Sequence, residues 1–275
     1  VYTGDHVLDF MLPNGLKQIV NFDLFQILSK KDHIYPLLLE NQLINLKEVE
    51  NHFSFIQINA DTIEDKIIDQ LKGLTQSIII LESFASNVFH SSRNAMIKFM
   101  KAGIQLPVVF KYHFGSLSEA AFRINLATNY GGLFIDGLGD GMLMSADDLN
   151  TKIINETVFG TLQAARTRIT KTEYISCPSC GRTLFDLQET TAMIRKKTDH
   201  LKGIKIGIMG CIVNGPGEMA DADYGYVGSG KGKITLYKGQ EVIKKAVPTA
   251  NALDELVKLI KDNGDWVDPE IINNL

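Results

Sequence analysis

The chain has 275 residues, of which 45% are hydrophobic and 22% are charged, and its formal net charge is −4. This is the composition of an ordinary soluble globular protein, and the length is sufficient for two domains. No segment approaches the roughly 20 consecutive apolar residues of a membrane span, and a weakly negative chain without a basic stripe points to neither a nucleic-acid partner nor an anionic membrane.

Strand and helix patterns alternate over the first part of the chain. Short apolar runs predict strands, and the segments between them predict amphipathic helices. The predicted strands are 33–40, 53–60, 77–82 and 107–113, and the predicted helices are 62–73 and about 91–102. Near-continuous apolar strands separated by such helices indicate a parallel sheet that is covered on both faces.

Further elements are predicted up to residue 166. Ser116 and Glu119 have the spacing of a capping box ahead of a helix that runs through Ala127. The apolar run 132–136 predicts the next strand, and a last helix begins near Asp148. These βα units amount to about half of an eight-stranded barrel, so residues 1–166 are expected to form a partial TIM-barrel-like domain.

A smaller α/β pattern occupies residues 167–275, which are expected to form a second domain. The predicted strands are 172–176, 204–209, 224–227 and 233–237, and the predicted helices are 184–200 and a closing helix capped by Asn251 and Asp254. Residues 228–232, Gly-Ser-Gly-Lys-Gly, lack the order of a phosphate-binding P-loop and lie between strands, so they predict a flexible hairpin turn.

All three cysteines of the chain fall within this second domain, in CPSCGRT at 177–183 and MGCIVNGPGE at 209–218. Cys177 and Cys180 have the spacing at which two thiolates bind one metal centre, and a predicted strand leads into Cys211. An odd number of cysteines argues against a disulfide framework. Three thiolates are one ligand short of a closed site, and the Glu218 carboxylate is the nearest good candidate for the fourth.

The residue pattern alone leaves other metal chemistries open. Three thiolates with His200 or a carboxylate could hold structural zinc, which would make the domain a zinc-stabilised interaction module. An iron–sulfur electron carrier without catalysis of its own is a second alternative, although an all-thiolate cluster needs a fourth cysteine. A redox-active C-x-x-C pair, in contrast, would not need Cys211.

The two motifs in this order resemble the cluster domain of the 4-hydroxy-3-methylbut-2-enyl diphosphate synthases of the non-mevalonate isoprenoid pathway, over roughly residues 170–265. The resemblance implies a sulfite-reductase-like domain with a [4Fe-4S] cluster on Cys177, Cys180, Cys211 and Glu218. Glu218 would also be catalytic, because a carboxylate is an exchangeable ligand that can leave one iron open to the substrate. Asn214 matches a position that contacts substrate in the family.

The resemblance also implies a reaction and partners. Members of the family use two electrons to open 2-C-methyl-D-erythritol 2,4-cyclodiphosphate and remove water, and reduced ferredoxin or flavodoxin supplies the electrons. Residues 1–166 show no set of arginines and lysines at strand ends for a diphosphate, so they are expected to belong to the extra barrel-like domain of the long form. We therefore expect the C-terminal part of a cytoplasmic bacterial oxidoreductase, homodimeric at full length and inactive as this piece alone.

Two groups of residues in the first domain could also carry chemistry. Ser83, Ser86 and His90 could pair a nucleophile with a base, but no strained G-x-S-x-G elbow surrounds them, so a solvated loop is expected. His113 and Asp136 fall at the carboxyl ends of predicted strands, where barrel enzymes place their chemistry. In an insert domain, these two positions would be structural.

Overall fold

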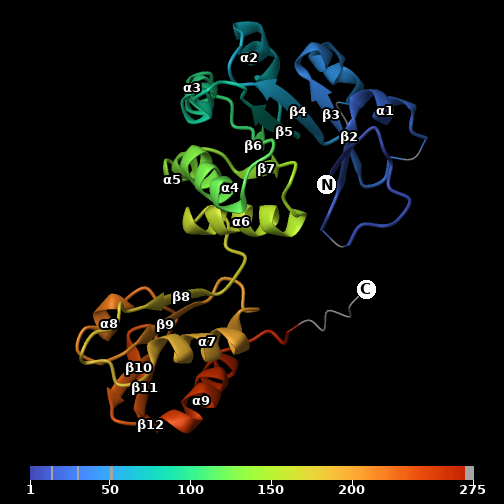
Figure 1. Cartoon of the computed structure of the whole chain (residues 1–275). Coiled ribbons are helices and arrows are strands. Elements are labelled where there is room, and N and C mark those ends of the chain that lie inside the picture. The colour runs from blue at the N-terminus through green and yellow to red at the C-terminus, as the bar shows by residue number, and fades with distance from the viewer. Residues whose placement is uncertain (14, 30, 50–51, 270–275) are drawn as a thin grey trace. The chain divides into compact units, whose positions relative to one another are not determined.

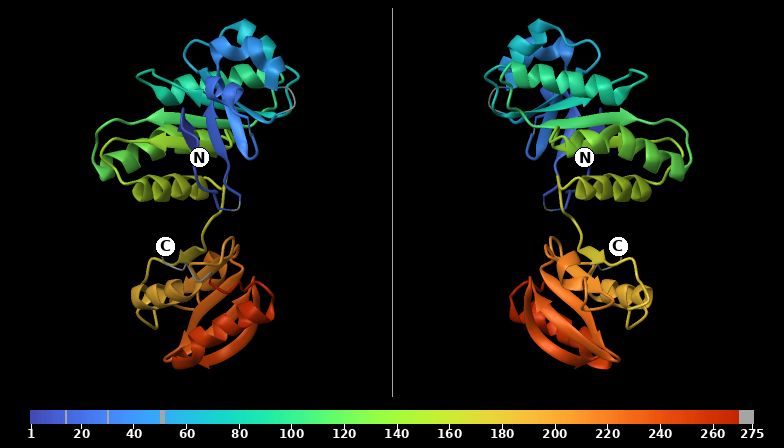
Figure 2. Two further views of the ribbon diagram at one scale, coloured as in Figure 1. Left: turned by 90° about the vertical axis from the view of Figure 1, so that its right-hand side faces the viewer. Right: turned by 90° about the vertical axis from the view of Figure 1, so that its left-hand side faces the viewer.

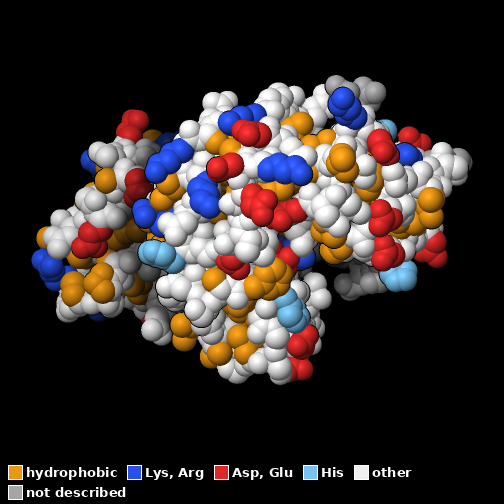
Figure 3. Space-filling view, turned by 90° about the horizontal axis from the view of Figure 1, so that it is seen from above, with side chains coloured by type: hydrophobic (Ala, Val, Ile, Leu, Met, Phe, Trp, Pro, Cys, Tyr) orange, Lys and Arg blue, Asp and Glu red, His pale blue; other side chains and the backbone are white. Residues whose placement is uncertain are grey.

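The computed structural model describes residues 1–13, 15–29, 31–49 and 52–269 (Figure 1). The chain divides into two compact units, Val1–Arg168 and Ile169–Leu275, and each has its own sheet and hydrophobic core. Basic, acidic and apolar side chains are interspersed on the face shown in Figure 3. Among the described residues, no helix is long and apolar enough to cross a membrane.

Seven strands of the first unit's described residues form one parallel sheet, with neighbours in sequence order. They are β1 (Tyr2–Gly4), β2 (Gln18–Asn21), β3 (Ile34–Leu39), β4 (Ser54–Asn59), β5 (Ser77–Glu82), β6 (Val108–His113) and β7 (Gly141–Ser145). The sheet is curled, and helices lie along its outer side (Figure 1). This confirms the predicted partial barrel-like α/β fold.

The helical segments of this unit connect its strands from β2 onwards, except α6, which follows the last strand, β7. They are α1 (Phe22–Ile27), η1 (Glu40–Val49), α2 (Asp65–Leu71), α3 (Val88–Lys101), α4 (Glu119–Leu126), η2 (Ala127–Gly131), α5 (Gly132–Ile135) and α6 (Thr151–Ala164). Burial alternates along β4 and β6: Ile56 and Ile58 are fully buried in the core, whereas Phe55 and Gln57 are only half-buried. The expectation of two fully covered faces is therefore wrong for these strands.

Residues 132–136 were predicted as a strand, and the structure shows that this prediction is wrong. The chain is helical from α4 through α5, and the next strand is β7. The buried residues Leu126, Tyr130, Leu133 and Phe134 recur at helical spacing on one face of this segment. A short apolar run is compatible with a buried helix as well as with a strand. The helix forms here because it packs its apolar face against the core.

Two predicted helix caps also differ from the structure. The Ser118 hydroxyl caps α4 by accepting a hydrogen bond from the Ala121 N–H at 3.3 Å, whereas Ser116 instead donates to Asp148. The closing helix α9 (Thr249–Asp262) begins after Pro248 and has no side-chain cap. Proline before the first turn fixes φ near the value that the chain needs there.

The second unit is a five-stranded sheet in the order β12-β11-β10-β9-β8. Its elements are β8 (Glu173–Ser176), α7 (Leu187–Thr198), β9 (Lys205–Met209), α8 (Gly215–Glu218), β10 (Tyr224–Gly230), β11 (Lys233–Lys238), β12 (Glu241–Pro248) and α9. β8, β9 and β10 are parallel, and β10, β11 and β12 are antiparallel (Figure 2). The sequence did not reveal β12, because Val247 is its only buried residue.

Candidate metal centre

Parallel pairing of β8 with β9 brings the three cysteines to one edge of the second sheet. Ser176 lies opposite Ile208 in the ladder, so Cys177 and Cys211 follow the two strands at the same carboxyl edge. Ligand sites of parallel α/β sheets form at this edge, because neighbouring strands release their loops there together.

The NGPGE motif, expected as a turn, forms the single helical turn α8. Pro216 lies in its first turn, where a missing N–H is no loss. The N–H groups of Gly217 and Glu218 both donate to the Asn214 carbonyl oxygen at 3.0 Å. Met219 is buried immediately afterwards, which anchors the turn and leaves the Glu218 side chain exposed at its end.

The structure brings all the predicted site residues together around one cavity. The cavity measures about 130 Å³, and Cys177, Cys180, Cys211, Asn214 and Glu218 all line it. His200, the alternative zinc ligand, lies outside this lining, because its Nε2 is 2.8 Å from the Val267 carbonyl oxygen. The nitrogen ligand of the zinc hypothesis is therefore engaged elsewhere.

Two of the three sulfurs are in contact with N–H donors. The Gly210 N–H donates to Cys177 Sγ at 3.3 Å. The main-chain N–H of Arg182, and then its guanidinium, lower the pKa of the exposed Cys180 thiol. A lowered pKa favours the thiolate, which is the form that binds metal. Arg182 is not among the predicted site residues, although a cation beside a C-x-x-C pair is a recognisable signal.

The donor set fits an iron–sulfur cluster in its chemistry. Three reduced cysteines and one carboxylate face a common cavity, and N–H donors to the sulfurs are typical of cluster sites. Within the described ranges, no three His, Cys, Asp or Glu side chains converge closely enough to hold a metal ion as they stand. The four donors therefore surround the cavity without closing on it.

Close backbone approach positions the loop of the cysteine pair. A Cβ added at Gly228 in β10 would lie 2.4 Å from the Gly210 carbonyl oxygen, and that oxygen accepts a hydrogen bond from the Leu184 N–H at 3.0 Å. Gly228 lies within β10 and not in the predicted flexible turn, and a glycine within a strand is a signal of such an approach. Ser179, between the two cysteines, has a left-handed φ of 64°, which is uncommon for a residue with a side chain.

The candidate residues of the first unit are held in structural contacts. Ser83 is buried and donates to Asp61 at 2.7 Å, so the solvated-loop expectation is wrong for Ser83, while Ser86 and His90 are exposed. Asp136 ends α5 instead of a strand. It accepts a hydrogen bond from the Arg93 guanidinium at 3.1 Å.

His113 does lie at the carboxyl end of β6, between a serine and an aspartate. Its Nδ1 is 2.9 Å from Ser145 Oγ, and its Nε2 is 3.3 Å from Asp147 Oδ1. In hydrolase triads the carboxylate contacts Nδ1 and the serine contacts Nε2, so this arrangement is reversed. The His113 and Asp147 side chains are also 54% and 58% exposed, which leaves a solvated surface contact instead of an activated nucleophile.

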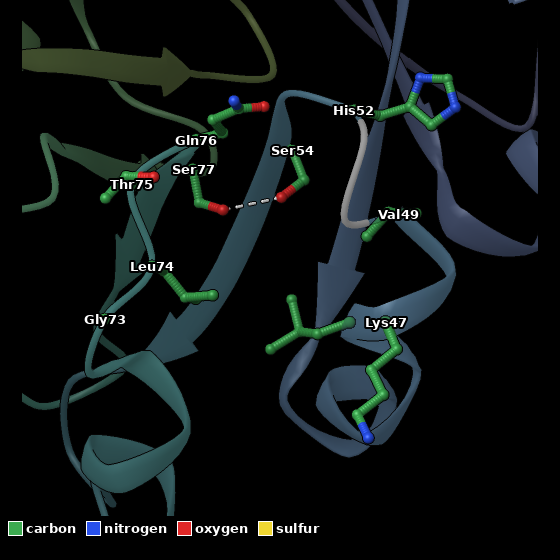
Figure 4. Close-up of a pocket in the computed structure, with 10 residues that line it drawn as sticks. Lys47, Val49, His52, Ser54, Gly73, Leu74, Thr75, Gln76 and Ser77 are labelled. Carbon is green, nitrogen blue, oxygen red and sulfur yellow. Dashed lines mark hydrogen bonds between the residues drawn. The ribbon is translucent and has the colours of Figure 1, made fainter.

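A larger cavity, of about 400 Å³, opens at the amino ends of β4 and β5 (Figure 4). Ser54 and Ser77 lie within hydrogen-bond distance there, with 2.9 Å between their hydroxyl oxygens, and Lys47, His52 and Gln76 also line the cavity. The amino ends of parallel barrel strands serve stability, whereas chemistry gathers at the carboxyl ends. The cysteine-lined cavity is therefore the better candidate site.

Comparisons with known proteins show the family to which the chain belongs. Residues 173–262 match the family model described as GcpE protein C-terminal domain. A 4-hydroxy-3-methylbut-2-en-1-yl diphosphate synthase (flavodoxin) of Parabacteroides distasonis is 43% identical over 97% of this chain and 43% of its own length. The synthase of Leptospira interrogans is 44% identical over 94% of this chain and 41% of its own. The chloroplastic synthase (ferredoxin) of Oryza sativa subsp. japonica is 47% identical over 74% of this chain and 28% of its own.

The matched family segment contains the three cysteines, Asn214 and Glu218. The two bacterial relatives extend the likeness through most of the first unit as well, because they cover nearly the whole chain. The chain therefore belongs to the 4-hydroxy-3-methylbut-2-en-1-yl diphosphate synthase family, as a segment that spans about two fifths of the length of these bacterial relatives.

Proposed function

We propose that this chain is the cluster-bearing C-terminal part of a synthase that converts 2-C-methyl-D-erythritol 2,4-cyclodiphosphate to 4-hydroxy-3-methylbut-2-enyl diphosphate. The observation that carries the proposal is the meeting of Cys177, Cys180, Cys211 and Glu218 around one cavity, within the segment that matches the family. The names of the relatives supply the product class.

The four donor residues would hold a [4Fe-4S] cluster, which supplies electrons and Lewis acidity when bound. Other groups of the site lie where they can stabilise the negative charge of the bound cluster. The Gly210 N–H already points at Cys177 Sγ, and the Arg182 guanidinium lies beside Cys180. The Arg182 contact favours the deprotonated, metal-binding form of Cys180.

Asn214 and Glu218 line the cavity from the two ends of the single turn α8. A carboxylate is a harder and more exchangeable ligand than a thiolate, so Glu218 is the donor that can yield its place to a substrate oxygen. The Asn214 amide has donors and an acceptor, and it is exposed beside the same cavity, where it can orient that oxygen. We assign Glu218 a catalytic role and Asn214 a role in substrate binding.

Lys111 on β6, at the middle of the first unit's sheet, is already paired. Its Nζ is 3.0 Å from Gln57 Oε1 and 3.3 Å from the Glu82 carboxylate. The substrate's diphosphate is therefore assigned to a part of the full-length enzyme outside this chain. In our proposal residues 1–166 are the additional barrel-like domain of the long form, residues 167–275 are the cluster domain, and the full-length enzyme is a cytoplasmic homodimer.

Anaerobic analysis of iron, sulfide and zinc, read with visible absorption, tests the proposal on wild-type and Glu218→Ala protein. We expect about four irons and four sulfides per chain in the wild type, a labile cluster in Glu218→Ala, and wild-type behaviour in Glu241→Ala, a control on β12. Stoichiometric zinc without sulfide after anaerobic reconstitution would refute the proposal. Turnover by this chain alone at the full-length level would refute the assignment of diphosphate binding to another part.

A further inference from the structure

A second opening of the metal centre lies between the cysteine loop and α7. This groove measures about 670 Å³ and runs from Cys177 along the helix to Arg195. Cys177 lines both the groove and the smaller cavity, whereas Cys211 and Glu218 line the smaller cavity only. The centre is therefore accessible from two directions, and one of them reaches a sulfur ligand without passing Glu218.

The groove has the surface of a protein contact. Phe185, Leu187 and Ala192 provide apolar area along it, and Thr191 and Arg195 continue it along the exposed side of α7. Phe185 and Leu187 pack on the core beneath, so the floor of the groove is rigid. A rigid, partly apolar floor with a polar rim is the composition of a transient protein interface.

The charge at the far end of the groove is positive. The last turn of α7 carries Arg195, Lys196 and Lys197, all exposed, and a nearby pocket is lined by both lysines with Lys261, Asp199 and Asp254. The Arg195 guanidinium is 3.8 Å from the Asp199 carboxylate and 5.1 Å from the centre of the Tyr174 ring. The four cations of this region outnumber its two carboxylates. Asp186 is the acidic residue that lines the groove near its other end, so the groove presents its cationic end away from the cysteine loop.

We propose that a small acidic electron-transfer protein, a reduced flavodoxin or ferredoxin, docks in this groove with its acidic rim on the last turn of α7. This inference rests on the proposed function, and the names of the relatives supply the donor class. Electrons then enter on the Cys177 side, while the substrate occupies the Glu218 side. Each encounter oxidises the donor by one electron, and two encounters provide the two electrons that the substrate consumes with two protons as one water leaves.

Stopped-flow reduction of the anaerobically loaded full-length enzyme tests this docking site. Lys196→Glu/Lys197→Glu should lower the second-order rate constant of reduction by flavodoxin at least about tenfold at low salt, and added salt should shrink the difference. Ala192→Trp, which fills the groove from an exposed position, should lower the same rate constant without the salt dependence. Lys245→Glu, on β12 at the opposite edge of the sheet, is the matched control and should react like the wild type.

Dithionite is too small to need the groove. It therefore distinguishes a variant that has lost donor docking from one whose metal centre itself can no longer be reduced. All variants should be reduced by dithionite at the wild-type rate, and binding of flavodoxin to the same enzymes, measured by calorimetry, should weaken in the groove variants alone. Unchanged flavodoxin kinetics in both groove variants would overturn the docking site, as would an equal loss of rate with dithionite and flavodoxin. A wild-type enzyme that dithionite cannot reduce would instead refute the proposed function.

Discussion

Replacement of Gly228 by alanine should destabilise the second unit, which carries the metal centre, more than substitution of any exposed residue near that centre. The added Cβ would lie 2.4 Å from the Gly210 carbonyl oxygen and 3.2 Å from Phe185 Cε1. A carbon normally approaches a carbonyl oxygen to about 3.3 Å, so β10 and the Gly210 backbone that follows β9 must separate by about 1 Å. The Gly210 peptide would then lose its contacts with Leu184 N–H and Cys177 Sγ, which are 3.0 Å and 3.3 Å long.

The expected loss follows from these two effects. Overpacking of a filled interior costs about 1–3 kcal/mol, and a weakened buried hydrogen bond adds about 1 kcal/mol. The free energy of unfolding of the second unit should therefore fall by about 2–4 kcal/mol. For a unit of about a hundred residues, this lowers Tm by roughly 8 °C or more.

Tryptophan fluorescence reports on this unit selectively. The chain has one tryptophan, Trp266, which packs edge-on against His200. Gly230→Ala is the matched control on the same strand, because a Cβ there meets Lys233 only at 3.9 Å, and it should leave Tm within about 2 °C of the wild type. Equal Tm values for Gly228→Ala and Gly230→Ala would show that the close approach to Gly210 does not restrict this position.

Other perturbations test separate parts of the structure. The buried Tyr130 hydroxyl has no hydrogen-bond partner among the described residues. Tyr130→Phe should therefore leave the free energy of unfolding of the first unit unchanged or raise it by up to about 1 kcal/mol, measured by urea titration with circular dichroism. A clear loss of stability would contradict this prediction. Ser118→Ala should lower the same quantity by about 1 kcal/mol through the lost cap of α4, and no change would exclude the cap. Hydrogen bonds from Lys238 and then Tyr224 lower the pKa of Asp265, so its stabilisation is present above the unfolded pKa near 4 and is lost as pH falls through the lower folded value. The difference in Tm between wild type and Asp265→Asn should therefore be constant from about pH 5 to 8 and shrink below about pH 4. A difference that grew as the pH fell would show that the pKa of Asp265 is not lowered by folding.

Local sequence patterns identify the core strands of the first unit and the residues of the metal centre. The predicted strands 53–60, 77–82 and 107–113 coincide closely with β4, β5 and β6, because apolar runs of strand length between amphipathic segments carry their own signal. The cysteine spacing and the NGPGE motif likewise identified a set of donor residues before any geometry was available. These are local properties of the chain, which neighbouring residues suffice to define.

Other features depend on contacts between residues that are distant in the sequence. Residues 132–135 are helical because they complete a buried helical face with Leu126 and Tyr130. β12 forms by pairing with β11, although its residues are mostly exposed and carry no apolar alternation. Gly228 is required by the backbone of Gly210, which directly follows the neighbouring strand β9. The groove along α7 exists because that helix packs beside the cysteine loop. Such features arise from the packing of separated segments, which no local pattern records.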